Sequence, residues 1–269
     1  MHQQDRLPDQ KTACPSRLYI GADGVMTPLR DVWKKDGSLG DLSCRYGECK
    51  TGVVYQTHQD KKGHNSRVKT RAYVATLDPV ATFEGLLGTL AHRCGHHAAK
   101  EVVVLGDGAP WLWFMFGRLF PSAIQILDFY HASEHLDKVG EAMYGKGSVL
   151  SGEWRQARQA ELKQDRMDAV LRAIAAWKPK TREHFKLRRT EFRYFRHNAE
   201  RMRYQTFLKA GYHIGSGVVE AACKQVIAAR LDQVGMHWKP ENAEAILTLR
   251  ASQLSTQPID LKPHLAMAA

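Results

Sequence analysis

Two apolar runs on either side of a short helical segment constrain the fold of this chain more than any other feature. The first run lies within Glu101–Gly108 and holds four consecutive apolar residues, and the second is Ala123–Leu127. Such runs, bounded by charge or glycine, are typical of strands that are buried on both faces. Pro110, which favours the first turn of a helix, stands between them. The order strand, helix, strand predicts a βαβ unit and a partly parallel sheet.

The rest of the chain predicts strands before this unit and helices after it. Three runs rich in β-branched and aromatic residues predict strands at Leu18–Ile20, Lys50–Thr57 and Tyr73–Leu77. The first strand is expected to end at Asp23-Gly24. Asp78-Pro79 is expected to start a helix, with Asp78 as its N-cap. Beyond Asp128 the pattern is helical, and after a break at Gly211–Gly217 two more helices are expected, at about Val218–Leu231 and Pro240–Leu254.

The positive charge of the chain is concentrated in one segment. The whole chain has 39 Lys and Arg against 28 Asp and Glu, but Ser151–Ala210 alone has 16 against 7. A basic helical segment with interleaved aromatic residues fits a surface that follows a phosphate backbone, or equally a solvated helix face above an aromatic core. The candidate DNA-binding residues are Lys178, Lys180, Arg182, Arg188, Arg189, Arg193, Arg196, Arg201 and Arg203.

Acidic residues follow three of the predicted strands. Asp23 and Asp107 each close an apolar strand and precede a glycine. In open α/β sheets, ligands collect at the carboxyl ends of the strands, although Asp-Gly is also a common turn. Asp128 closes the next strand and could simply be the N-cap of the following helix, with His131 in its first turn.

Glu220 lies in the segment Gly215–Lys224, where two glycines flank Ser216, a plausible N-cap. An ion pair with Lys224 at i,i+4 would explain the glutamate alone, but not the glycine-rich turn before it. Two aspartates and one glutamate form a minimal cage for Mg²⁺, which prefers oxygen ligands. Two such ions, about 3.5–4 Å apart, can assist both the attacking and the leaving oxygen of a phosphodiester.

Three strings in the chain resemble the catalytic domain of bacterial insertion-sequence DDE transposases, most of all the ISKra-type group. They are Val103–Trp111, Ile126–Leu136 and Gly215–Lys224, and the resemblance extends from about Tyr19 to Leu254. It implies an α/β fold, an RNase H-like mixed sheet flanked by helices, with an all-α insertion before the last catalytic helix.

The resemblance also implies roles for the acidic residues. Asp23, Asp107 and Glu220 would bind two Mg²⁺ ions, with Mn²⁺ as a substitute, and Asp128 with His131 would form a D-x-x-H motif near the scissile phosphate. The implied activity is cleavage at transposon ends and strand transfer into target DNA, by a homo-oligomer that holds two ends together. An RNase H-like nuclease or resolvase, and an inactive DNA-binding remnant, are the alternatives.

The length of 269 residues suits one large domain with an insertion. We expect a tail or linker remnant (1–16), the first part of the RNase H-like core (17–135), a basic helical insertion (136–210), the last core helices (211–254) and a C-terminal tail (255–269). Family members usually carry a further N-terminal region that recognises transposon ends. Because the first expected strand begins so early, an N-terminally truncated copy is a further alternative.

Other chemistry is less well supported by the sequence. Cys44 and Cys49, with His58 and His64 downstream, make a weak zinc candidate because the strand expected at Lys50 would constrain them. Cys94-x-His96-His97 stands at an expected helix end, where histidines suit the helix dipole. Neither a P-loop nor a hydrolase elbow is present. Five cysteines, no signal-peptide pattern and no long apolar run favour a cytoplasmic protein that is not associated with a membrane. The resemblance to bacterial transposases implies in addition a bacterial protein associated with the nucleoid.

Overall fold

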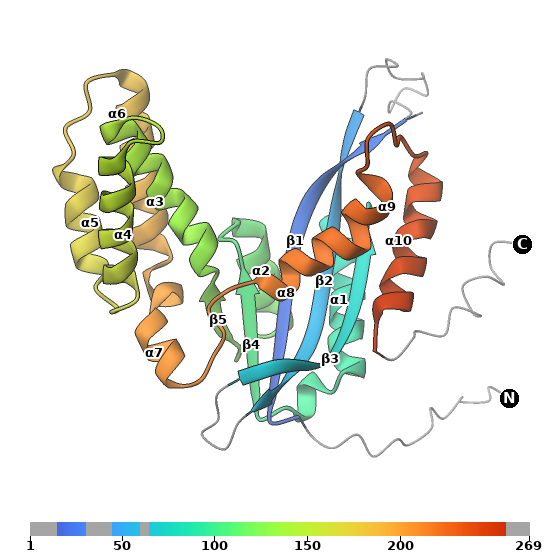
Figure 1. Cartoon of the computed structure of the whole chain (residues 1–269). Coiled ribbons are helices and arrows are strands. Elements are labelled where there is room, and N and C mark those ends of the chain that lie inside the picture. Colours follow the sequence, from blue (N-terminus) through green and yellow to red (C-terminus); the bar gives the residue numbers. More distant parts are fainter. Residues whose placement is uncertain (1–14, 31–44, 60–64, 257–269) are drawn as a thin grey trace, which may run out of the picture.

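A five-stranded mixed sheet forms the centre of the molecule (Figure 1). The computed structural model describes residues 15–30, 45–59 and 65–256. The strand order is β3-β2-β1-β4-β5, in which β1 is antiparallel to β2, β2 is antiparallel to β3, and β4 and β5 continue parallel to β1. This order, with these directions, is the RNase H-like arrangement that we expected. The strands are β1 (Arg17–Leu29), β2 (Arg45–Gln59), β3 (Asn65–Thr76), β4 (Glu101–Gly106) and β5 (Ile124–Leu127).

Helices cover both faces of the sheet. On one face lie α1 (Val80–Arg93) and α2 (Pro110–Leu119), and α2 begins at Pro110 as predicted. On the other face a continuous helical rod crosses β1 and β2 (Figure 1). The rod consists of α8 (Gly217–Ala222), a π-helical segment η3 (Cys223–Ala228) and α9 (Ala229–Leu231). After it, α10 (Pro240–Leu254) packs along β3, the edge strand.

A bundle of helices stands beside β5 and connects β5 to α8 (Figure 1). Its core includes Val170, Ile174, Trp177 and Phe195, all buried. None of the helices in the described part of the chain is long and apolar enough to cross a membrane. The bundle elements are α3 (Phe129–Tyr144), α4 (Val149–Leu162), α5 (Met167–Ala176), α6 (Arg182–His197), η2 (Ala199–Met202) and α7 (Tyr204–Lys209). Outside the bundle, the short 3₁₀ helix η1 (His96–Ala98) lies between α1 and β4.

The pairing register of the three parallel strands aligns three aspartates. Leu105 of β4 pairs with Gly21 of β1 and with Ile126 of β5. Side chains alternate between the two faces of a strand, so residues two positions further on point to the same face. The residues two positions beyond this row are Asp23, Asp107 and Asp128. All three therefore project from the same face, at the carboxyl ends of the parallel strands.

Two local predictions were wrong. Asp23-Gly24 is not a turn, because β1 continues to Leu29 and Gly24 pairs with Lys50 of β2. β4 pairs with β1 only as far as Gly21, whereas the antiparallel strand β2 pairs with β1 as far as Leu29. The hydrogen bonds from β2 therefore keep β1 extended through Asp23-Gly24. Asp78 is not a helix cap either: α1 begins at Val80 with Pro79 as its N-cap.

Gly21 brings α8 close to the sheet. A Cβ atom at this position would lie 2.2 Å from Cγ2 of Val219, far inside van der Waals contact. Val219 is buried, and its β-branched side chain cannot rotate freely to make room. The absence of a side chain at Gly21 therefore fixes the distance between β1 and the helix that carries Glu220.

We predict that Gly21→Ala lowers the free energy of unfolding by about 1–3 kcal/mol, as overpacking a core does. Chemical denaturation measures the change. The matched control is Gly117→Ala in α2, where an added Cβ has nothing within 4 Å, and where replacing a helical glycine should stabilise by about 0.5–1 kcal/mol. Equal effects of the two substitutions would contradict the close approach of α8.

Candidate active site at the carboxyl ends of the parallel strands

Asp23 is a half-buried carboxylate whose hydrogen bonds come from two sides. The backbone N–H of Gly24 donates to Oδ1 at 2.7 Å, and the thiol of Cys223 on η3 donates to Oδ2 at 3.5 Å. Burial raises the pKa of Asp23 and the nearby Asp107 raises it further, whereas the Gly24 N–H, the Cys223 thiol and His131 lower it. Burial and the negative charge of Asp23 also raise the pKa of Cys223, so the thiol keeps the proton that it donates.

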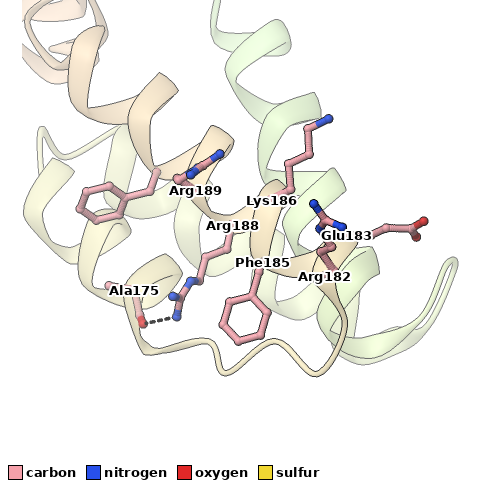
Figure 2. A pocket seen from close by; sticks show the side chains of 8 residues that line it. Ala175, Arg182, Glu183, Phe185, Lys186, Arg188 and Arg189 are labelled. Carbon is pink, nitrogen blue, oxygen red and sulfur yellow. Dashed lines mark hydrogen bonds between the residues drawn. The ribbon is translucent and has the colours of Figure 1, made fainter.

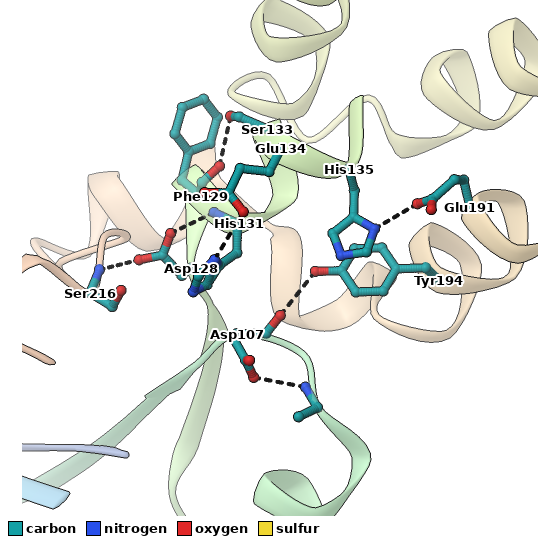
Figure 3. Close-up of polar contacts among 11 residues, drawn as sticks. Asp107, Asp128, Phe129, His131, Ser133, Glu134, His135, Glu191, Tyr194 and Ser216 are labelled. Carbon is teal, nitrogen blue, oxygen red and sulfur yellow. Dashed lines mark hydrogen bonds and ion pairs between the residues drawn. The ribbon is translucent and has the colours of Figure 1, made fainter. Parts of the chain in front are cut away.

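Asp107 stands next to Asp23 at the end of β4. Its Oδ1 accepts a hydrogen bond from the backbone N–H of Ala109 at 2.9 Å, which shapes the turn through Gly108. Gly108 has a φ of 99°, and a side chain there would collide with Tyr194. The hydroxyl of Tyr194 donates to the backbone carbonyl of Asp107 at 3.1 Å (Figure 3). The loop that carries Asp107 is therefore held from both sides.

The donor set of Asp23 and Asp107 suits a divalent cation. Within the described residues, neither carboxylate forms an ion pair with a lysine or arginine. Burial and the nearby Asp107 disfavour the ionised form of Asp23, and a bound cation would offset that cost. Carboxylate oxygens are also the ligands that Mg²⁺ prefers.

Asp128 uses its carboxylate to hold two backbone segments together. It is buried and forms the N-cap of α3, where Oδ1 accepts from the N–H of His131 at 2.9 Å. Its Oδ2 accepts from the N–H of Ser216, in the turn before α8 (Figure 3). The capping interpretation of Asp128 is therefore confirmed. The carboxylate acts on the backbone of His131, whereas Nδ1 of that imidazole lies 3.5 Å from Glu134.

Glu220 is exposed in this structure and does not join the aspartates. Its Oε1 accepts from Nζ of Lys224 at 2.6 Å, which is the i,i+4 pair that the sequence spacing allows. Cys223, three residues further along the same helix, contacts Asp23 directly. Positions i and i+3 are neighbours on a helix surface. Glu220 therefore lies about one turn from the site, at the start of a rod whose π-helical segment begins at Cys223.

A buried glutamate, a half-buried histidine and a tyrosine ring link the bundle to this site, and sequence reasoning missed them as a group. Glu191 on α6 is 3% exposed and its Oε2 lies 2.6 Å from Nδ1 of His135 on α3. The His135 ring stacks on Tyr194, with centroids 3.7 Å apart (Figure 3). Tyr194 continues the chain of contacts to Asp107. The only sequence signal was indirect, because His135 follows the D-x-x-H string and Tyr194 belongs to an aromatic stripe.

The nine candidate DNA-binding residues fall into two groups. Arg188 and Arg201 have structural contacts: Arg188 donates to the carbonyl of Trp177 at 2.7 Å, and Arg201 donates to Gln125 of β5 at 2.7 Å. Burial lowers the pKa of Arg201, whose guanidinium also covers the ring of Trp113. The other seven are exposed: Lys178, Lys180, Arg182, Arg189, Arg193, Arg196 and Arg203.

The cysteine and histidine combination of Cys44, Cys49, His58 and His64 lies only partly within the described chain. Cys44 and His64 are outside the described residues. Cys49 is buried in β2, and burial raises its pKa to about 12.

Comparisons with known proteins give little guidance. No protein-family model matches the chain. No curated protein sequence matches it either. Among solved structures, the chain is similar to the "Drosophila P element transposase strand transfer complex" with a TM-score of 0.27 and 11% identity, over 95% of this chain and 72% of that one. A TM-score this low supports no functional argument, so the function has to be inferred from the site itself.

We predict that Asp23→Asn stabilises the protein when no divalent cation is present. Because the folded-state pKa of Asp23 is raised, its ionised form penalises folding, and the penalty grows as the pH rises through that pKa. The gain in the free energy of unfolding should therefore be present at pH 7 and shrink as the pH falls toward about 4. Urea denaturation in a chelator, with Asp232→Asn as an exposed control, measures it; destabilisation at pH 7 would contradict the prediction.

Proposed function

We propose that this chain is a DDE-type transposase, similar to those of ISKra-type insertion sequences, that cleaves DNA at transposon ends and transfers the strand into target DNA. The observation that supports this most directly is the close pair Asp23 and Asp107, which has no cationic partner among the described residues. Carboxylates in this position are suited to a divalent cation and a phosphodiester.

In this proposal Asp23 and Asp107 would hold Mg²⁺, or Mn²⁺ as a substitute, and Glu220 would complete the cage. The bound cation would supply charge neutralisation for the attacked phosphate. His131, near enough to Asp23 to affect its pKa, would contact the phosphate or accept a proton at an imidazole nitrogen. Asp128 would position His131 through the backbone, and Cys223 would orient Asp23. Attack by water would break the P–O bond to the 3′ oxygen and free a 3′-hydroxyl. That hydroxyl would then attack a phosphodiester of the target DNA, forming a new P–O bond and releasing the 3′ oxygen of the target strand as a hydroxyl.

One requirement of this proposal is a movement of Glu220. Its carboxylate must leave Lys224 and turn toward Asp23, about one helical turn away. The ion pair is exposed, with side chains 64% and 69% accessible, and such pairs contribute at most about 1 kcal/mol. A bound cation would therefore easily outweigh it. If Glu220 did not move, the second candidate, a DNA-binding remnant that no longer cleaves, would be favoured.

The exposed cations of the bundle would bind the DNA backbone. One pocket there is lined by Arg182, Lys186, Arg188 and Arg189, with Phe185 and Phe192 beside them (Figure 2). Phe185 is 51% exposed, which is unusual for a phenylalanine. Cationic side chains neutralise phosphates, and an exposed ring can stack on an unpaired base. Because two transposon ends must be brought together, at least two copies of the chain would act together.

We predict that Asp107→Asn abolishes Mg²⁺-dependent cleavage of DNA and leaves DNA binding nearly unchanged. The substitution removes one negative ligand while the backbone contacts of this loop, including the Tyr194 hydrogen bond, stay in place. Cleavage of labelled transposon-end DNA and a gel-shift titration measure the two properties. Normal cleavage by this variant would overturn the assignment of the site.

A pre-cut end with a free 3′-hydroxyl separates the two enzyme classes. A transposase joins this end to target DNA, whereas a nuclease or resolvase yields no joined product. The same assay with Glu220→Gln tests the glutamate: loss of joining supports its role in the cage, and full joining contradicts it.

We predict that Arg182→Ala with Arg189→Ala weakens DNA binding and its dependence on salt. Removing one cation–phosphate interaction should reduce the slope of log K against log [salt] by about 0.9, so the double variant should show a slope smaller by about 1.8. The matched control is Arg67→Ala with Lys69→Ala on β3, which removes the same charge from an exposed strand outside the bundle. If both double variants bound DNA equally weakly, the effect would be net charge and not a bundle surface.

A further inference from the structure

Three histidines gather on the molecule away from the aspartates. They are His92 in the last turn of α1, and His96 and His97 in η1. One possible ligand atom from each ring lies within 4.8 Å of the corresponding atoms of the other two. The His92 and His97 rings stack with centroids 4.7 Å apart, and His96 meets His97 at 5.9 Å with its ring perpendicular.

The backbone between them brings these rings together. Gly95 adopts a left-handed conformation with a φ of 80°, which ends α1 and reverses the chain. Its N–H donates to the carbonyl of His92 at 2.9 Å, and its own carbonyl accepts from Ala98 at 3.0 Å. The positions of His96 and His97 relative to His92 therefore follow from a hydrogen-bonded turn.

The surroundings of the cluster also suit a metal ion. His96 is half-buried against Phe120, with ring centroids 5.4 Å apart. His92 and His97 are exposed, so an ion can reach the cluster from solvent.

We propose that His92, His96 and His97 form a binding site for a divalent transition-metal ion of the Zn²⁺ class. Imidazole nitrogens suit zinc and its neighbours, whereas Mg²⁺ prefers oxygen ligands. Three histidines occupy three positions of a tetrahedral site and leave the fourth for water. Cys94, which the sequence placed with His96 and His97, is not part of this group, and burial raises its pKa to about 11.

This site is separate from the candidate active site. Glu101 begins β4 shortly after η1, and Asp107 follows the end of β4, so the length of the strand lies between the two sites. A metal ion here would connect the end of α1 to η1, just before β4 begins at Glu101. By joining these two elements the ion would stabilise the folded chain, and it would take no part in the proposed reaction at the aspartates.

The test is a calorimetric titration of the full chain, without a polyhistidine tag, with Zn²⁺ alone. We expect saturable binding at one site that His92→Ala or His97→Ala weakens more than tenfold, since even loss of a second-layer partner costs about 10–100-fold. Both residues are exposed, so neither substitution should impair folding. Far-UV circular dichroism checks this.

Two control variants make the result specific. His197→Ala removes an exposed histidine from α6, outside the cluster, and should leave Zn²⁺ affinity unchanged. Asp107→Asn should also leave it unchanged, which separates this site from the proposed transposase chemistry. No saturable binding, or equal binding by the wild-type chain and His97→Ala, would overturn the proposal. Loss of binding in Asp107→Asn would overturn it as well.

Discussion

The register of three parallel strands is the constraint on which this molecule depends. Because Gly21, Leu105 and Ile126 form one row of the sheet, the aspartates two positions beyond must share a face. Their environments then separate them. Asp128 uses both oxygens to accept from backbone N–H groups. Asp23 and Asp107 lie close enough for Asp107 to raise the pKa of Asp23, and neither forms an ion pair with a described lysine or arginine. Three aspartates in equivalent positions therefore differ in role. Asp128 holds two backbone segments together, whereas Asp23 and Asp107 form a pair suited to bind a cation.

The remaining elements are placed relative to that row by a few contacts. The Asp128 clamp fixes the turn at Ser216, and that turn starts the helix that carries Glu220. On the other side, the hydroxyl of Tyr194 holds the carbonyl of Asp107. The helical bundle is therefore not an independent appendage, since its basic helix α6 contacts the loop of a candidate ligand. Displacing α6 would disturb the site without changing any carboxylate.

Sequence patterns predicted the sheet well and the site only in part. Apolar runs identify buried strands because burial requires them, so β4 and β5 were found closely. The pattern failed where contacts with another part of the chain determine the local structure. Asp23-Gly24 is a common turn dipeptide, but pairing with β2 keeps these residues in strand β1. It also failed for Arg201, since charge gives no sign that a guanidinium covers Trp113. The sequence singled out His96 and His97 but paired them with Cys94 and missed His92, because His92 meets them only across the end of a helix.

If the proposed function holds, the distribution of charge assigns DNA binding and chemistry to different parts of the chain. A phosphate near Asp23 and Asp107 meets two negative groups, so the pair repels its proposed substrate until a cation is bound. The exposed cations of α6 cannot provide that neutralisation directly, because among the described residues none pairs with either aspartate. Their attraction acts at a distance and weakens with salt, whereas the repulsion between the two carboxylates is local and persists. Affinity for DNA and dependence on the divalent cation should thus respond to different substitutions.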